Sequence, residues 1–175
     1  MSSSNAYILM GGNLGNVRQS FQHAINALCL NGQKPVALSH VYTTEAWGMQ
    51  GASPFLNQAL CLNTPLKPDE LMRLLLDIEV KLGRIRRPGE LLSRCIDLDI
   101  LIYDELIIKT PLLEIPHPRM HLRRFALAPL ADLAPDLKHP ILGKSIGQLL
   151  NDCTDQLQVI RTDSSENESL CATTI

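Results

Sequence analysis

Two aspartates, Asp97 and Asp99, interrupt an apolar run and have the spacing of metal ligands. The run 95–103 is typical of a buried strand, and successive side chains of a strand point to opposite faces. Its alternation predicts one apolar face, made by Ile96, Leu98, Ile100 and Ile102. The two carboxylates then share the other face, about 6.5–7 Å apart along the strand. Carboxylates so placed suit one or two Mg²⁺ ions, which also take substrate phosphates as ligands.

Four arginines precede this strand: Arg84, Arg86, Arg87 and Arg94. Guanidinium groups bind phosphate oxygens in a planar, often bidentate geometry. Carboxylates, a hard metal and arginines on one wall are typical of phosphoryl transfer. The pattern is equally compatible with a structural alternative, in which the aspartates lie on an edge strand and pair with Arg87 and Arg94.

Phe55 and Asn57 are candidates for binding a flat ring, because they share one face of the predicted strand 55–63. A phenyl ring can stack on a heterocycle, and an amide can hydrogen-bond the edge of that heterocycle. An ordinary half-buried strand is the alternative for these two residues.

Further polar side chains occur in irregular stretches. Segment 116–125 contains His117 and Arg123, which suit phosphate oxygens. Two long connections, 44–54 and 84–94, have the length of many functional loops. Each stretch could instead be a structural or surface connection.

The bulk composition describes an ordinary globular protein. The chain has 175 residues, 45% hydrophobic and 19% charged, and a formal net charge of −2. It predicts one domain over residues 1–161 and a disordered polar tail over 162–175. The small net charge gives no electrostatic footprint for nucleic acid or a membrane surface. Five scattered cysteines without a Cys-x-x-Cys pair favour a cytoplasmic setting.

Hydrophobic periodicity predicts the order strand, helix, strand, strand, helix, strand over residues 6–10, 17–28, 35–43, 55–63, 68–82 and 95–103. Asn13 or Asn16 is expected to cap the first helix. This order is that of an α+β, ferredoxin-like βαββαβ core, an antiparallel sheet with both helices on one face. A hairpin arm at 105–108 and C-terminal helices at 126–134 and 143–151 are expected additions. The uncovered face is where Asp97, Asp99, Phe55 and Asn57 could meet.

Several blocks taken together resemble one family. They are Gly11–Gly15, Tyr42–Thr44 with Trp47-Gly48, Phe55–Asn57, Leu82–Arg86, Arg94 with Ile96–Ile100, and Pro116–Met120. The chain is similar, from about Tyr7 to Leu150, to the 6-hydroxymethyl-7,8-dihydropterin pyrophosphokinases of folate biosynthesis. Departures from the commoner pattern include Gly12, Leu76, Leu91, Cys95 and Leu122.

The resemblance implies transfer of the pyrophosphoryl group of ATP to the hydroxymethyl group of 6-hydroxymethyl-7,8-dihydropterin, with release of AMP. It implies that Asp97 and Asp99 hold two Mg²⁺ ions, and that Arg84 and Arg94 assist catalysis. It assigns the nucleotide to Glu79, Arg84, Arg86, Arg94, Ile100, His117 and Arg123. It assigns the pterin to Thr44, Trp47, Phe55, Asn57 and Phe125, with the two phenylalanines on either side of the ring. A monomer is expected, with a homodimer as the alternative.

Three other functions are compatible with parts of the pattern. A non-catalytic metabolite-binding module would leave the acidic pair solvated and would not bind MgATP. A nucleic-acid binder would use the same sheet surface, but the acidic pair and the absence of net positive charge argue against it. A different magnesium-dependent transferase would keep the carboxylates and need no ring-binding residues such as Phe55, Asn57 and Phe125.

Overall fold

The computed structural model describes residues 3–45, 53–84 and 93–162. Six strands form one sheet in the order β5-β1-β4-β3-β8, with β2 also paired to β4. The strands are β1 (Ser4–Gly12), β2 (Pro35–Leu38), β3 (Val41–Thr44), β4 (Phe55–Thr64), β5 (Asp97–Tyr103) and β8 (Val159–Thr162). Neighbouring strands run antiparallel throughout the described sheet. The α+β, ferredoxin-like arrangement predicted from the sequence is confirmed.

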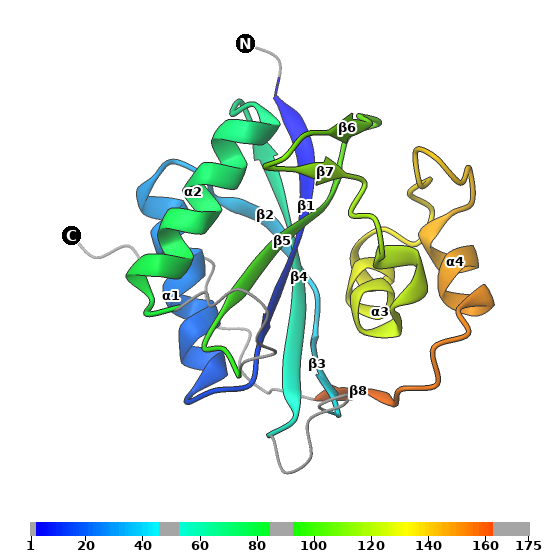
Figure 1. Cartoon of the computed structure of the whole chain (residues 1–175), viewed down its shortest axis with the longest axis horizontal. Helices are drawn as coiled ribbons and strands as arrows, with labels where there is room; N and C mark the ends of the chain where they lie inside the picture. The colour runs from blue at the N-terminus through cyan, green and yellow to red at the C-terminus, as the bar shows by residue number, and fades with distance from the viewer. Residues whose placement is uncertain (1–2, 46–52, 85–92, 163–175) are drawn as a thin grey trace.

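Helices α1 (Val17–Leu30) and α2 (Pro68–Lys81) cover one face of the sheet (Figure 1). Their apolar stripes pack on the strands in one core, which includes Ile8, Met10, Phe21, Leu28, Leu60, Leu71 and Leu75. Asn16, and not Asn13, caps α1, because the Asn16 side chain accepts a hydrogen bond from the Gln19 amide. Each helix begins and ends within two residues of its predicted limits.

The opposite face of the sheet is not free, which corrects the prediction. Helices α3 (Arg124–Leu133) and α4 (Ile146–Asp152) lie on this side (Figure 1). A second core joins them to the sheet through Leu9, Leu101, Ile102, Leu127, Leu130 and Ile146. The covering follows from the apolar stripe of α3, whose burial removes nonpolar surface from water. The site therefore occupies only the part of this face that α3 leaves open.

A β-bulge in β5 overturns the predicted face of Ile102. Tyr7 pairs with Ile102 and Ile8 pairs with Ile100, so Leu101 is an extra residue on β5. An extra residue reverses the alternation beyond it. Ile96, Leu98 and Ile100 pack in the α1–α2 core as predicted. Ile102 lies in the α3–α4 core beside Leu101.

The local structure differs from the prediction at four further places. The strand predicted over 35–43 is divided into β2 and β3, with Ser39 and His40 between them. The predicted arm 105–108 does not pair with β5, because β6 (Ile108–Lys109) pairs with β7 (Glu114–Ile115). A 3₁₀ turn, η1 (Met120–Leu122), precedes α3. The last helix begins at Ile146, because Ser145 forms its N-terminal capping box with Gln148.

Strand β8 was not predicted from the sequence. It pairs with β3 from Val41 to Thr44, and Arg18 of α1 donates a hydrogen bond to Thr162 at 2.8 Å. Thr162 therefore belongs to the sheet and not to the predicted tail, whose other residues lie outside the described ones.

No helix in the described part of the chain has the length and apolar character needed to cross a membrane.

Candidate active site

Strand register brings the acidic and ring-binding candidates to the same end of one sheet face. Gly11 of β1 pairs with Asp97 of β5 on one side and with Asn57 of β4 on the other. The Cα atoms of Asp97 and Asn57 are thus about 10 Å apart, two strand spacings, and β1 projects no side chain between them because Gly11 has none. A Cβ on Gly11 would lie 3.2 Å from Asn57 Oδ1. The predicted meeting of the acidic pair with Asn57 on one face is confirmed.

Asp97 is held by two arginines. Arg84 Nη1 donates to Asp97 Oδ1, and Arg94 Nη1 donates to Asp97 Oδ2. The structural alternative noted for the sequence is thus partly realised, with Arg94 as expected and with Arg84 as the second partner. Arg87, the other partner of that alternative, lies outside the described residues.

Glu79 of α2 binds one of these arginines and the backbone of β5. Its side chain is 1% exposed, and its Oε1 accepts hydrogen bonds from Arg84 and, at 2.7 Å, from the Leu98 amide. Since β5 is an edge strand, the Leu98 amide points away from β1 toward α2. Glu79 therefore fixes both Arg84 and the backbone between the two aspartates.

Asp99 has different surroundings. It lies two residues further along β5, opposite Leu9. Within the described part of the chain, no hydrogen bond or ion pair reaches its carboxylate. The pKa of Asp99 is raised to about 6, chiefly by burial and then by the nearby carboxylates of Asp97 and Glu79, while Arg84 and Arg94 oppose the rise.

The ring-binding candidates lie on β4, β3 and α3. The Arg94 guanidinium stands 5.5 Å above the Phe55 ring. Asn57 is buried and donates from Nδ2 to Thr44 Oγ1 at 3.1 Å. Phe125, at the start of α3, packs at the edge of the second core, with the Arg123 guanidinium 5.5 Å from its ring. A sandwich of a ligand between Phe55 and Phe125 stays a prediction.

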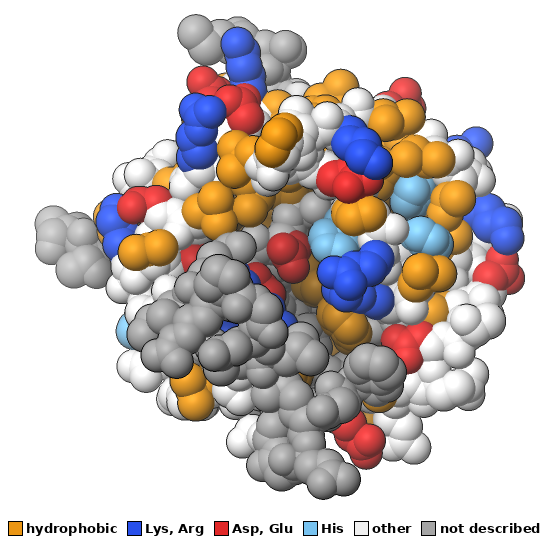
Figure 2. All heavy atoms as spheres, in the orientation of Figure 1, with side chains coloured by type: hydrophobic (Ala, Val, Ile, Leu, Met, Phe, Trp, Pro, Cys, Tyr) orange, Lys and Arg blue, Asp and Glu red, His pale blue; other side chains and the backbone are white. Residues whose placement is uncertain are grey.

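His117 is set up as a neutral hydrogen-bond donor. Its Nδ1 accepts from the Arg119 amide at 3.3 Å, which leaves the proton of a neutral ring on Nε2. Burial lowers the pKa of His117, and the charges of Arg123 and Arg119 lower it further. Figure 2 shows basic and histidine side chains gathered beside an acidic hollow on this face.

Three predicted site residues are not placed on this face. Trp47 and Arg86 lie outside the described residues. The Ile100 side chain is 2% exposed and lies in the opposite core, which excludes it from the carboxylate face. Its amide shares the outer edge of β5 with that of Leu98, because main-chain groups repeat every two residues. Any nucleotide contact of Ile100 is therefore through its backbone.

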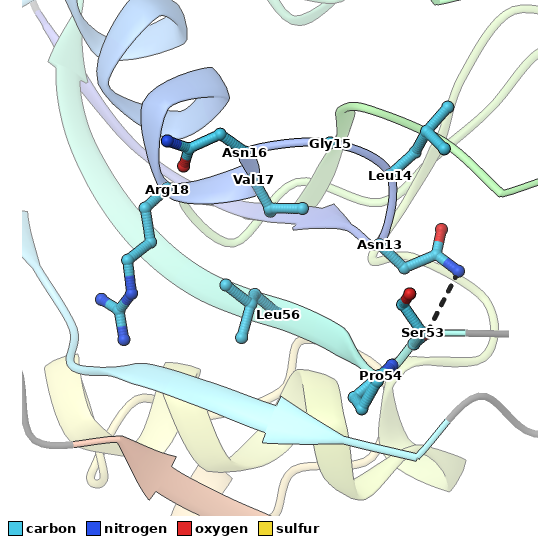
Figure 3. Close-up of a pocket in the computed structure, with 9 residues that line it drawn as sticks. All are labelled: Asn13, Leu14, Gly15, Asn16, Val17, Arg18, Ser53, Pro54 and Leu56. Carbon is cyan, nitrogen blue, oxygen red and sulfur yellow. Dashed lines mark hydrogen bonds between the residues drawn. The ribbon is translucent and has the colours of Figure 1, made fainter.

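A separate pocket of about 480 Å³ opens beside the turn between β1 and α1. Figure 3 shows its lining, which includes Asn13, Arg18, Ser53 and Leu56. Leu56 packs against the α1–α2 core, so this pocket lies on the side of the sheet that α1 and α2 cover. It is distinct from the carboxylate face.

In the described part of the chain, metal-binding side chains do not form a complete cluster. Over residues 3–45, 53–84 and 93–162, no three His, Cys, Asp or Glu side chains are grouped so that they could hold an ion. Asp97 and Asp99 alone would supply two carboxylates, and a metal held there needs further oxygen ligands from a substrate.

An antiparallel α+β sheet with carboxylates, arginines and aromatic rings on one face has the equipment of a domain that handles phosphorylated ligands. The family model for 7,8-dihydro-6-hydroxymethylpterin-pyrophosphokinase (HPPK) matches residues 7–135. The chain belongs to this family.

Curated relatives agree with the family model. The 2-amino-4-hydroxy-6-hydroxymethyldihydropteridine pyrophosphokinase of Pseudomonas aeruginosa is 39% identical over 150 residues, which are 84% of this chain and 90% of that protein. The protein of the same name from Synechocystis sp. is 40% identical over 154 residues, 85% of this chain and 77% of that protein.

Solved structures support the fold. A Plasmodium falciparum HPPK-DHPS triple mutant with STZ-DHP aligns with a TM-score of 0.66 at 15% identity. The alignment covers 86% of this chain and 43% of that chain, so this chain spans less than half of that protein.

Proposed function

We propose that this chain transfers the pyrophosphoryl group of ATP to the hydroxymethyl group of 6-hydroxymethyl-7,8-dihydropterin. The hydroxyl oxygen forms a bond to the β-phosphorus, and the bond from that phosphorus to the α,β-bridging oxygen breaks. AMP leaves with the electron pair, and the hydroxyl proton passes to solvent or to a phosphate oxygen. The observation that carries the proposal is the register that sets Asp97, Gly11 and Asn57 side by side, in a chain of this family.

Asp97 and Asp99 are the residues that would hold Mg²⁺. Their hard carboxylate oxygens fit this ion, and Asp99 offers oxygens with no protein partner among the described residues. Bound Mg²⁺ would neutralise charge on the oxygens of the transferred group. Both oxygens of Asp97 accept hydrogen bonds from arginines, so a metal ion at Asp97 competes with two cations, which favours a change of partner by at least one arginine.

The triphosphate of ATP supplies that new partner. Guanidinium groups bind phosphate oxygens as well as carboxylates. Arg84 and Arg94 therefore neutralise Asp97 in the free chain and can pass to the phosphates as the metal enters. Glu79 keeps hold of Arg84 from α2. His117 Nε2 and Arg123 extend the same phosphate wall, and Arg86 is proposed to join it.

The pterin is proposed to bind at the Asn57 end of the face. Asn57 and Thr44 are buried and already bonded to each other, so their polar groups are oriented before a ligand arrives. A site built to bond the amide edge of a ring rejects ligands that leave these groups unpaired. Phe55 and Phe125 would contact the ring faces, and Trp47 is assigned here from the resemblance alone.

The direct test is product analysis. The chain is mixed with MgATP and 6-hydroxymethyl-7,8-dihydropterin, and the nucleotides are separated by chromatography. Formation of AMP without ADP distinguishes pyrophosphoryl transfer from single phosphoryl transfer. Absence of AMP, or AMP formed equally without the pterin, contradicts the proposal.

The carboxylate role is tested by Asp97→Ala and Asp99→Ala. We expect each to lower kcat by about 10³-fold, because each removes stabilisation of charge in the transition state. Asp77→Ala is the control, since Asp77 lies on the exposed side of α2 and pairs only with Lys81 among the described residues. Near-native turnover in both site variants would refute the metal role.

A further inference from the structure

Asn13 is a buried polar residue whose hydrogen bonds join three segments. It follows β1, is 5% exposed, and does not cap α1. Its Oδ1 accepts from the Arg94 amide at 2.9 Å. Its Nδ2 donates to Ser93 Oγ at 3.2 Å and to the Ser53 carbonyl at 3.3 Å (Figure 3). We call these four residues, Asn13, Ser53, Ser93 and Arg94, the Asn13 junction.

The main chain of Arg94 is bonded on both sides by this turn. The Asn13 and Leu14 amides donate to the Arg94 carbonyl at 2.9 and 3.1 Å, while Asn13 Oδ1 takes the Arg94 amide. The asparagine thus pairs with Arg94 as a neighbouring strand would. A Cβ on Gly12 would lie 2.7 Å from the Cys95 carbonyl oxygen and 3.2 Å from that of Arg94. The turn therefore packs directly against the segment that leads into β5.

Arg94 is the residue that contacts both halves of the proposed site. Its guanidinium binds Asp97 and stands over the Phe55 ring. Ser53, also held by Asn13, lies two residues before Phe55. The Asn13 junction therefore sets the Arg94 backbone at a fixed place relative to both the carboxylates and the ring-binding strand.

We propose that Asn13 is a positioning residue that places Arg94 between the phosphate side and the pterin side of the site and so couples binding of the two substrates. Asn13 touches neither substrate and acts through Arg94. The proposal rests on the function proposed above, because Arg94 has two substrates to connect only if that function holds.

The first measurement tests the junction without using activity. Amide hydrogen exchange of Arg94 is followed by NMR in the full chain and in Asn13→Ala. We expect exchange at Arg94 to rise by about tenfold or more, since its amide loses its acceptor. Asn16→Ala is the matched control. It removes the N-cap of α1 at an exposed position. We expect it to leave the exchange rate of the Arg94 amide within about twofold of that in the native chain.

The second measurement tests the coupling. We expect Asn13→Ala to lower kcat by about 10- to 100-fold, because misplacement of Arg94 disturbs the transition state. The ratio of pterin dissociation constants without and with a non-hydrolysable MgATP analogue should fall toward one. A merely structural asparagine would leave that ratio unchanged, as Asn16→Ala should. If Asn13→Ala does not fold, Asn13→Asp takes its place. This variant keeps the oxygen that accepts from the Arg94 amide and loses the two hydrogen bonds that Nδ2 donates to Ser53 and Ser93, and its coupling ratio should also fall.

Native exchange at Arg94 in Asn13→Ala overturns the junction. Raised exchange with native kcat and a native coupling ratio overturns the positioning role. If the native chain forms no AMP, the proposed function has failed, and the exchange result still decides whether the junction holds Arg94.

Discussion

Asp97 and Asp99 lie two residues apart on one strand, yet their carboxylates have different surroundings. Asp97 is paired with two guanidinium groups, whereas the Asp99 carboxylate has no hydrogen-bond partner among the described residues. Burial, together with the neighbouring carboxylates, raises the pKa of Asp99 to about 6. A carboxylate in this condition is costly for the free protein and useful to a ligand that brings positive charge.

The raised pKa of Asp99 predicts a pH-dependent effect of Asp99→Asn on stability. The folded chain holds this proton more tightly than the unfolded chain, so the stability contributed by protonated Asp99 is lost as pH rises from about 4 to 6. Asparagine does not ionise. We expect Asp99→Asn to raise the free energy of unfolding at pH 8 and to change it little at pH 4, measured by urea denaturation without Mg²⁺. An equal difference at both pH values would contradict this assignment.

The helices and the sheet form two cores, and only one of them is expected to affect ligand binding directly. Helix α2 packs on the sheet through Leu71, and α3 packs on the other face through Leu127. Both leucines are fully buried. Phe125 belongs to α3, near its first turn, so the packing of this helix sets where the ring lies. Only the α3 core is expected to influence the ring-binding end of the site directly.

Two matched substitutions distinguish the effects of the two cores on stability and on pterin binding. Leu71→Ala and Leu127→Ala should each lower the free energy of unfolding by about 2–5 kcal/mol, the usual cost of truncating a buried leucine. At a temperature where both variants stay folded, only Leu127→Ala should weaken pterin binding, measured by calorimetry. Equal weakening in the two variants would show that α3 has no special role in placing Phe125.

At the scale of the whole molecule, the charge of Asp97 in the free site is already compensated within the protein. Arg84 and Arg94 neutralise Asp97, and Glu79 shares Arg84. A metal ion alone competes with these arginines for Asp97, and Arg94, whose only ion pair among the described residues is with Asp97, loses its counter-ion if it is displaced. A metal that arrives with a triphosphate provides both the replacement cation and the replacement anion.

Metal and nucleotide should therefore bind together. We expect Mg²⁺ alone to raise Tm only slightly, and MgATP to raise it by more than the separate effects of Mg²⁺ and of ATP, since only ligands that bind the folded chain stabilise it. Arg94→Ala frees one oxygen of Asp97 and should strengthen binding of Mg²⁺ alone while weakening that of MgATP. Tight binding of Mg²⁺ alone to the native chain would contradict the arginine exchange.

Local patterns were enough to predict most of the helices and strands, and the face of β5 that carries Asp97 and Asp99. The alternation around Asp97 and Asp99 correctly placed them opposite Leu98 and Ile100, because a strand repeats every two residues whatever its neighbours are. The stripes of α1 and α2 were found for a similar reason. The bulge at Leu101 was not, because it depends on how β5 pairs with β1.

The amino-acid sequence by itself determined which side chains share a face, where the helices on the first face begin and end, and which residue types could meet a polyphosphate. The tertiary structure decided that Gly11 lies between Asp97 and Asn57, that α3 covers part of their face, and that Asn13 binds Arg94. These contacts join residues as far apart in the sequence as Gly11 and Asp97, which are 86 positions apart. Periodicity within one segment specifies the faces of that segment, but its partners depend on the packing of the entire chain.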